Sequence, residues 1–330
     1  MKHFKILLFL VIVSVISSCK DDANKSDFLP KSIGPLNAIT VVVENDLWKG
    51  KVGDKIREHY AAPAIGLTWN EPLFTINPVP KKVFSGSIRN SRSVLYVQKD
   101  TVDVAHVKTN LYARPQKVGV IKATTEEDII KNIDAKALEM IAAFKEVELE
   151  EEQKRFLRSL NKEPTLQETF GITLNMPSAY KVSKEEDNFV WIDRDILKGN
   201  MNIIAYEMPG DYFKTDSTLV KDIVRMRDSI GSKYIPGPDV PGKRTHMRTE
   251  PAFSPYVSPT TVAGINAVEV RGVWDIKNYP MAGPFVSYII NDKENDRKLV
   301  IEGFTFAPAT DKRDFMFQLE AIIKTLRIKE

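Results

Sequence analysis

The chain carries two hydrophobic periods, and the shorter one predicts strands. Apolar and β-branched residues recur at every second position or in short runs between turn residues. In the first half, the predicted strands are residues 39–43, 71–76, 93–97 and 117–121. In the second half, they are residues 170–176, 188–192, 201–206, 264–273, 285–291 and 298–306. The acidic segment DKEND between the last two strands is typical of a hairpin turn, so we expect mainly antiparallel sheets.

The longer period, with apolar residues three and four apart, predicts helices. A short helix is expected over residues 53–61 and an amphipathic helix over residues 216–230. A final helix begins at Thr310 or Asp311, either of which is a suitable N-cap. Strands grouped with helices, without regular strand–helix alternation, indicate an α+β fold with helices on one face of each sheet.

The longest helical pattern begins at Thr124, which with Glu127 has the spacing of a capping box. The pattern contains no Gly or Pro before Pro164. It predicts a helix over residues 124–163 that connects two domains. Its middle, residues 145–155 (KEVELEEEQKR), is strongly charged. We therefore expect a solvated joint or a kink at that point.

The N-terminus has the pattern of a lipoprotein signal peptide. Lys2 and Lys5 precede the apolar run ILLFLVIVSVI, and small residues lead to Cys19, the only cysteine in the chain. This run of about 11 residues would reach roughly 16 Å as a helix, too short for a hydrocarbon core of roughly 30 Å. The pattern predicts cleavage before Cys19 and attachment of a fatty acid such as palmitate to its sulfur.

These signals divide the chain into five parts. Residues 1–18 are the predicted signal peptide, and residues 19–38 are a polar, lipidated tether. An N-terminal α+β domain over residues 39–123 and a C-terminal α+β domain over residues 164–330 are joined by the helix 124–163.

The residues that follow the cysteine give a clue to the face of the membrane on which the protein lies. Lys20, Asp21 and Asp22 resemble the surface-export signal of Bacteroidota lipoproteins, although a short charge run is also typical of any solvated linker. The sequence thus predicts a lipid anchor in the outer membrane, and leaves the surface-exposed and periplasmic placements both open.

Composition narrows the function classes. The chain has 47 basic and 44 acidic residues, and two of the basic ones lie in the signal peptide, so the rest is nearly neutral. A nucleic-acid-binding protein would carry a clear basic excess, and we expect no nucleic-acid partner. With 43% hydrophobic and 28% charged residues, the composition is that of an ordinary globular protein.

No catalytic or metal motif is recognisable. The chain lacks the HExxH zinc motif and the GxSxG nucleophile elbow, and its only cysteine is the predicted lipid site. His59 and His106 have the contexts of structural histidines. Arg89 and Arg92 would form an anion clamp only if a loop turned both to one side. We expect no cofactor and no metal, and a non-enzymatic role.

The best candidate for a binding segment is the proline-rich stretch 235–259. A long loop without secondary structure is uncommon unless it is functional or disordered. Basic groups beside aromatic rings suit an anionic glycan or the acidic surface of an envelope protein, although the pattern is more often that of a stiff surface loop without function. The candidate residues are Lys243, Arg244, His246, Arg248, Phe253 and Tyr256.

Several segments together resemble a known family. They are ITVVVENDLW at 39–48, GDKIR at 53–57, NEPLF at 70–74, FSG at 84–86 with RNSR at 89–92, and MAGPFVSY at 281–288. The chain resembles the uncharacterised Bacteroidota lipoproteins grouped as domain of unknown function 4837, over its whole length beyond the tether. The resemblance implies an exported lipoprotein and carries no activity, substrate or catalytic residue.

The sequence therefore favours a lipid-anchored envelope protein that binds a partner or supports an assembly. The alternative is an envelope hydrolase that uses carboxylates in a cleft between the domains. Two convergent carboxylates with opposed pKa shifts would favour the hydrolase, because one must act as an acid and the other as a base.

Overall fold

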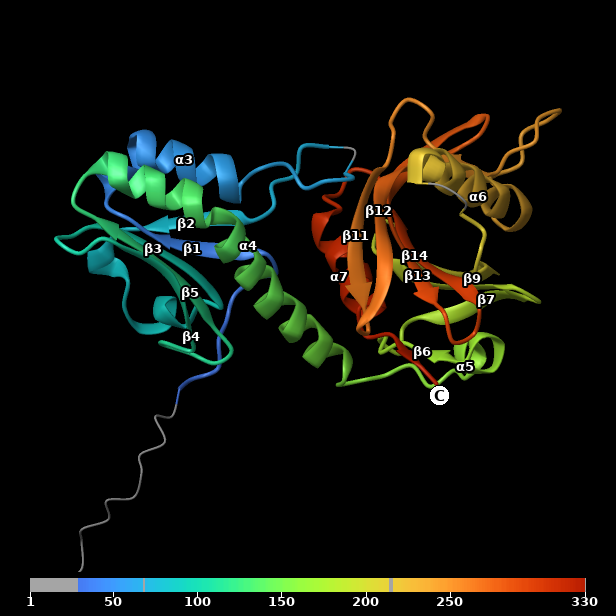
Figure 1. Ribbon diagram of the computed structural model, residues 1–330, viewed down its shortest axis with the longest axis horizontal. Helices are drawn as coiled ribbons and strands as arrows, with labels where there is room; N and C mark the ends of the chain where they lie inside the picture. Colours follow the sequence, from blue (N-terminus) through green and yellow to red (C-terminus); the bar gives the residue numbers. More distant parts are fainter. Residues whose placement is uncertain (1–28, 68, 214–215, 330) are drawn as a thin grey trace, which may run out of the picture.

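The computed structural model describes residues 29–67, 69–213 and 216–329, which form two domains connected by one long helix (Figure 1). The predicted signal peptide, Cys19 and the segment Lys20, Asp21 and Asp22 lie outside the described residues. Among the helices of the described part, none has both the length and the apolar character needed to cross a membrane.

The first domain is built on a five-stranded sheet in the order β2-β1-β3-β5-β4. Its strands are β1 (Ala38–Val42), β2 (Thr75–Val79), β3 (Ser93–Lys99), β4 (Val104–Thr109) and β5 (Lys117–Ala123). All neighbours in this sheet are parallel except β4 and β5. This sheet therefore departs from the antiparallel expectation, because alternation in the sequence does not distinguish the two pairings.

Both faces of this sheet are covered, as a parallel sheet requires. The helices α2 (Asn45–Lys49) and α3 (Lys51–Tyr60), with the first half of the long helix, bury one face in a core. Two short 3₁₀ segments, Lys81–Val83 and Gly86–Asn90, lie beside the other, smaller core around Phe84.

The long helix α4 covers Glu126–Phe156, so it is shorter than the predicted 124–163. Thr125, one residue after the predicted cap, accepts a hydrogen bond from the backbone N–H of Asp128. Phe144 on α4 is buried in the first core, and Phe156 is buried in the core of the second domain. A single helix thus contributes to both cores.

The charged middle of α4 remains helical, and three of its glutamates are buried. Glu148, Glu151 and Glu152 are 0%, 4% and 2% exposed. Arg92 donates two hydrogen bonds of 2.9 Å to the carboxylate of Glu148, and Arg155 lies against the other two glutamates. The expected solvated joint is therefore found on one face only. Glu146, Glu150 and Lys154 are exposed, whereas Arg92, 56 residues away from Glu148, neutralises that buried glutamate.

The second domain is built on an eight-stranded, wholly antiparallel sheet in the order β10-β12-β13-β14-β9-β8-β7, with β11 also paired to β12. Its strands are β7 (Lys181–Glu186), β8 (Phe189–Ile196), β9 (Gly199–Pro209), β10 (Met247–Thr249), β11 (Tyr256–Val262), β12 (Ile265–Ile276), β13 (Tyr279–Asp292) and β14 (Arg297–Phe306).

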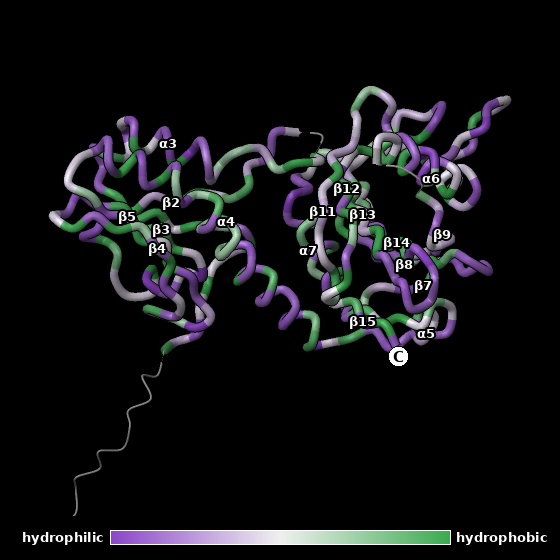
Figure 2. Tube along the Cα trace, in the orientation of Figure 1, coloured by the Kyte–Doolittle hydropathy of each residue, from purple (hydrophilic) through white to green (hydrophobic). Residues whose placement is uncertain are grey.

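Helices lie on both faces of this sheet, whereas the sequence predicted helices on one face only. The helix α7 (Arg313–Ile323) packs into one core and α6 (Leu219–Tyr234) into another. The strands β13 and β14 are buried on both faces, which explains their nearly continuous apolar runs. Figure 2 shows the hydrophobic stretches of both domains gathered in their sheets.

One predicted strand is largely absent. Residues 170–176 were expected to form a strand, but the region holds the helix α5 (Thr165–Phe170) and the two-residue strand β6 (Ile172–Thr173), which pairs with β15 (Arg327–Ile328). Gly171 ends α5 in the left-handed conformation with φ of 67°, a position that favours glycine. The apolar run is therefore split between a helix end and a short strand.

Candidate functional site

The two domains meet where a loop of the first domain contacts α7. The loop runs over residues 61–73 and reaches α7 in Figure 1. Glu71 at its end is buried and accepts hydrogen bonds of 2.7–2.9 Å from the backbone N–H groups of Lys312 and Arg313, at the start of α7. The predicted caps Thr310 and Asp311 do not cap α7, because the N-cap residue is Lys312 and Glu71 supplies the acceptor.

Close packing continues along the same loop at Gly66. A Cβ on Gly66 would lie 2.8 Å from the Cβ of Arg271 on β12, and the φ of Gly66 is +84°. A larger residue would therefore both clash and be strained. The loop thus approaches β12 at a point where only glycine fits.

A cavity of about 460 Å³ lies between the domains, within the size range of small-molecule sites. Its walls come from the loop 61–73, from α4, from β11 and β12, and from α7. The apolar lining residues are Ala64, Ile65, Leu67, Leu73, Tyr256, Val257, Met316 and Phe317, and the polar ones are Asn37, Lys145, Ser258, Glu269, Arg271, Arg313 and Glu320.

A network of charged side chains forms one wall of the cavity. Arg271 donates to Glu269 at 2.6 Å and to Glu320 at 2.7 Å. The second oxygen of Glu320 accepts from Lys324 at 2.6 Å, and that of Glu269 accepts from the Tyr288 hydroxyl at 2.7 Å. All four carboxylate oxygens therefore have a donor.

Both carboxylates of this network are held in the ionised form. Burial by itself would raise the pKa of Glu269, but the Arg271 guanidinium outweighs burial and the net pKa is lowered. For Glu320, burial is outweighed by Arg271 and Lys324, which lower its pKa to about 2. A carboxylate pair for hydrolysis needs one member that stays protonated near neutral pH. Neither glutamate meets this requirement.

Lys145 differs from the other charged groups that line the cavity. It projects from the charged middle of α4, and burial lowers its pKa below the usual 10.5. In the part of the chain that the structure describes, its ammonium group makes no hydrogen bond or ion pair. Lys145 is partly buried, and Glu320 and Glu269 attract its ammonium through space without accepting a hydrogen bond from it. A partly buried ammonium without an acceptor is costly, so Lys145 marks a point in the cavity wall where an anionic acceptor is missing.

The predicted binding segment 235–259 is more ordered than expected. It contains β10 and the start of β11. Arg248 on β10 makes two hydrogen bonds of 2.9 and 3.0 Å to Asp275, and Arg244 donates to the backbone oxygen and hydroxyl of Ser232. These two arginines therefore already have partners within the protein.

The remaining residues of that segment are not brought to one place. Tyr256 is 62% exposed and lines the cavity between the domains. Lys243 lies away from it in a turn, where its backbone N–H donates a hydrogen bond to the backbone oxygen of Val240. The backbone of His246 forms an isolated antiparallel β-bridge with that of Pro236. Burial, and to a smaller extent the positive charge of Lys277, lowers the pKa of the His246 side chain. Phe253 is exposed. Only Tyr256 belongs to the cavity.

The proposed anion clamp of Arg89 and Arg92 does not form. Arg92 is buried against Glu148, while the Arg89 guanidinium lies 5.0 Å from the ring of Tyr112. The two arginines therefore have separate structural contacts.

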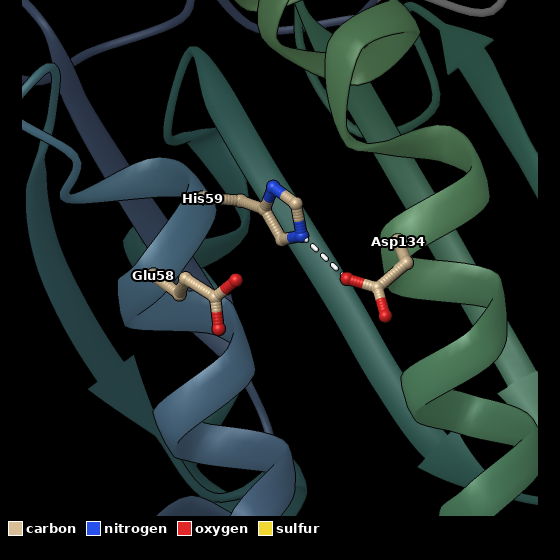
Figure 3. Close-up of side chains that lie close together, drawn as sticks. All are labelled: Glu58, His59 and Asp134. Carbon is tan, nitrogen blue, oxygen red and sulfur yellow. Dashed lines mark hydrogen bonds and ion pairs between the residues drawn. The ribbon is translucent and has the colours of Figure 1, made fainter.

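Within the described residues, one group of three side chains has metal-ligand chemistry (Figure 3). Figure 3 shows His59 of α3 and Asp134 of α4 pointing toward one another, and His59 Nε2 lies 2.7 Å from Asp134 Oδ1. Lys55 Nζ lies 2.8 Å from the Glu58 carboxylate and 3.4 Å from that of Asp134. The contacts of Lys55 and His59 with Asp134 join α3 to α4.

These features define a two-domain α+β protein with a cavity at the domain interface. The chain belongs to the family described as Domain of unknown function (DUF4837), whose model matches residues 159–325. A second model, Domain of unknown function (DUF8532), matches residues 32–157. No curated protein matches the chain.

The two matches refine the extent of the resemblance. The segment 281–288 lies within the DUF4837 match, whereas the segments between residues 39 and 92 lie within the DUF8532 match. The DUF4837 model thus covers the second domain rather than the whole chain beyond the tether. The biochemical role of both families is unknown, and no residue role comes with either match.

Proposed function

We propose that the protein is an exported lipoprotein, anchored in the outer membrane through Cys19, that binds a small ligand between its two domains. The apolar run followed by Cys19 supports the anchor. The observation that carries the binding function is the cavity, which has walls from both domains and a mixed apolar and charged lining.

Binding is favoured over hydrolysis by the state of the carboxylates. The two glutamates that converge on Arg271 both have lowered pKa values, so neither holds a proton to donate. Binding is also favoured over docking through segment 235–259, because Arg244 and Arg248 have internal partners.

The anchor is tested by Cys19→Ala. Two or more acyl chains, at roughly 0.8 kcal/mol per buried methylene, hold a protein firmly in a membrane. The variant should therefore accumulate unprocessed or leave the membrane fraction. A Cys19→Ala variant that still matures and stays with the membrane would refute the lipid anchor.

The membrane face is tested by protease added to intact cells. If Lys20, Asp21 and Asp22 direct surface export, the natural protein is digested and a variant with alanine at all three positions is protected. Equal protection of the two forms would place the protein in the periplasm.

The cavity is tested by recovering what it holds. The full-length lipoprotein is purified from its native membrane, denatured, and the released small molecules are identified by mass spectrometry. Ala64→Phe, which fills part of the cavity, should lose the released compound. Ala252→Phe on an exposed loop is the matched control and should retain it. If no compound is enriched in the natural protein relative to the Ala64→Phe variant, the result contradicts the binding function.

A further inference from the structure

The cavity wall has one unmatched charge. Arg271, Glu269 and Glu320 are paired with one another and with Lys324 and Tyr288. Arg313, the remaining charged lining residue, donates to Asp314 at 2.8 Å and to the backbone oxygen of Pro72. Among the described residues, Lys145 is left as the single charged lining residue without a hydrogen bond or a close ion pair.

Neither glutamate of the wall accepts a hydrogen bond from Lys145. The groups that act on it most strongly are Glu320, Arg271, Glu269 and Lys324. Every oxygen of the two glutamates already accepts a hydrogen bond from another side chain. Turning either glutamate to Lys145 would leave a buried guanidinium or hydroxyl without its acceptor, which is costly.

The rest of the lining indicates what else the ligand must offer. Ile65, Leu67 and Leu73 face the cavity from the first domain, and Met316 and Phe317 face it from α7. Burying apolar surface against these side chains is favourable, at about 25 cal/mol per Å². A ligand with an apolar body would therefore fill most of the volume.

We propose that the cavity selects a ligand with one anionic group and an apolar body, and that the anionic group binds the ammonium of Lys145. This inference rests on the proposed binding function. Charge-assisted hydrogen bonds to a carboxylate or phosphate are among the strong ones in proteins. The ligand supplies the anionic acceptor that the wall lacks, while the apolar body contacts the side chains of the loop 61–73 and α7.

The inference has a signature that a purely structural lysine would not give. Lys145→Met removes the desolvation cost that lowers the pKa of Lys145 and breaks no hydrogen bond or ion pair, so the ligand-free protein should melt at a higher temperature than the natural protein. The same substitution should remove the preference for anions. A gain in stability with a loss of selectivity is typical of a residue kept for binding.

The test uses the full-length lipoprotein in lipid nanodiscs, with empty nanodiscs as reference, and isothermal titration calorimetry. The probes are 4-phenylbutyrate, 4-phenylbutyl phosphate, 4-phenylbutanol and 4-phenylbutylamine, which share one apolar body. We expect at least one anion to bind roughly tenfold or more tightly than the alcohol, the usual effect of one charge-assisted hydrogen bond. The carboxylate and phosphate arms distinguish the two anion chemistries.

The variants separate this inference from the proposed function. Lys145→Met should bring the anions to the affinity of the alcohol, and Lys154→Met, an exposed lysine of the same helix, should leave the preference unchanged. Equal binding of acid and alcohol, or a preference that survives Lys145→Met, overturns the inference but leaves cavity binding intact if Ala64→Phe still weakens all probes. No measurable binding of any probe also overturns it, and the recovered-ligand experiment then decides the proposed function alone.

Discussion

Replacing Glu71 should destabilise the protein more than any exposed carboxylate would. The side chain is 7% exposed and is the acceptor for two backbone N–H groups that begin α7. Loss of an N-cap acceptor costs about 1 kcal/mol, and each buried donor left without an acceptor adds about 1–3 kcal/mol. Because water can reach part of this helix end, we expect Glu71→Ala to lower the free energy of unfolding by about 2–4 kcal/mol.

The assay is thermal or urea unfolding of the full-length protein, followed by circular dichroism. At roughly 2–4 °C per kcal/mol for domains of this size, Glu71→Ala should lower the melting temperature by about 4–16 °C. Glu71→Gln keeps one acceptor oxygen, so its melting temperature should lie between those of the natural protein and Glu71→Ala. The control is Glu294→Ala in the exposed 293–296 turn. If Glu71→Ala melts no lower than this control, the loop does not hold α7 in the manner described.

Three further results are expected. Glu148→Gln should cost about 3–5 kcal/mol because it strands Arg92, and Arg92→Met with Glu148→Leu should recover much of that loss in urea unfolding. Glu320 has a folded pKa of about 2 against an ordinary 4.5, so its stabilisation of about 3 kcal/mol is complete above pH 4.5 and lost as pH falls toward 2; Glu320→Gln should flatten that part of the stability profile. Arg248→Ala, which breaks a half-exposed pair with Asp275, should cost about 1 kcal/mol and leave probe binding unchanged.

Local patterns predicted the elements that depend on local chemistry. The predicted strands 285–291 and 298–306 lie within β13 and β14, and the acidic turn between them forms the expected hairpin. The helix expected over 216–230 lies largely within α6. In each case the apolar period and the turn residues are contained in the segment itself.

The features that the sequence did not reveal depend on distant partners. Glu71 and the α7 N-terminus are 241 positions apart, and Arg92 and Glu148 are 56 apart. A charged run such as residues 145–155 is equally compatible with a solvated face and with a face buried against an arginine. For the same reason, Lys145 could not be distinguished from its charged neighbours until the fold placed it in the cavity wall.

The helix α4 has a consequence for how the protein denatures. Phe144 belongs to the core of the first domain and Phe156 to that of the second, and both lie on the same 31-residue helix. Melting of either core would free part of α4 and remove contacts from the other core, so we expect the two domains to stabilise each other. The DUF8532 match ends at residue 157 and the DUF4837 match begins at residue 159, so the boundary between the two families lies at the end of α4. We expect the chain on either side of that boundary to unfold in a single cooperative transition, and two separate transitions in calorimetry would contradict this expectation.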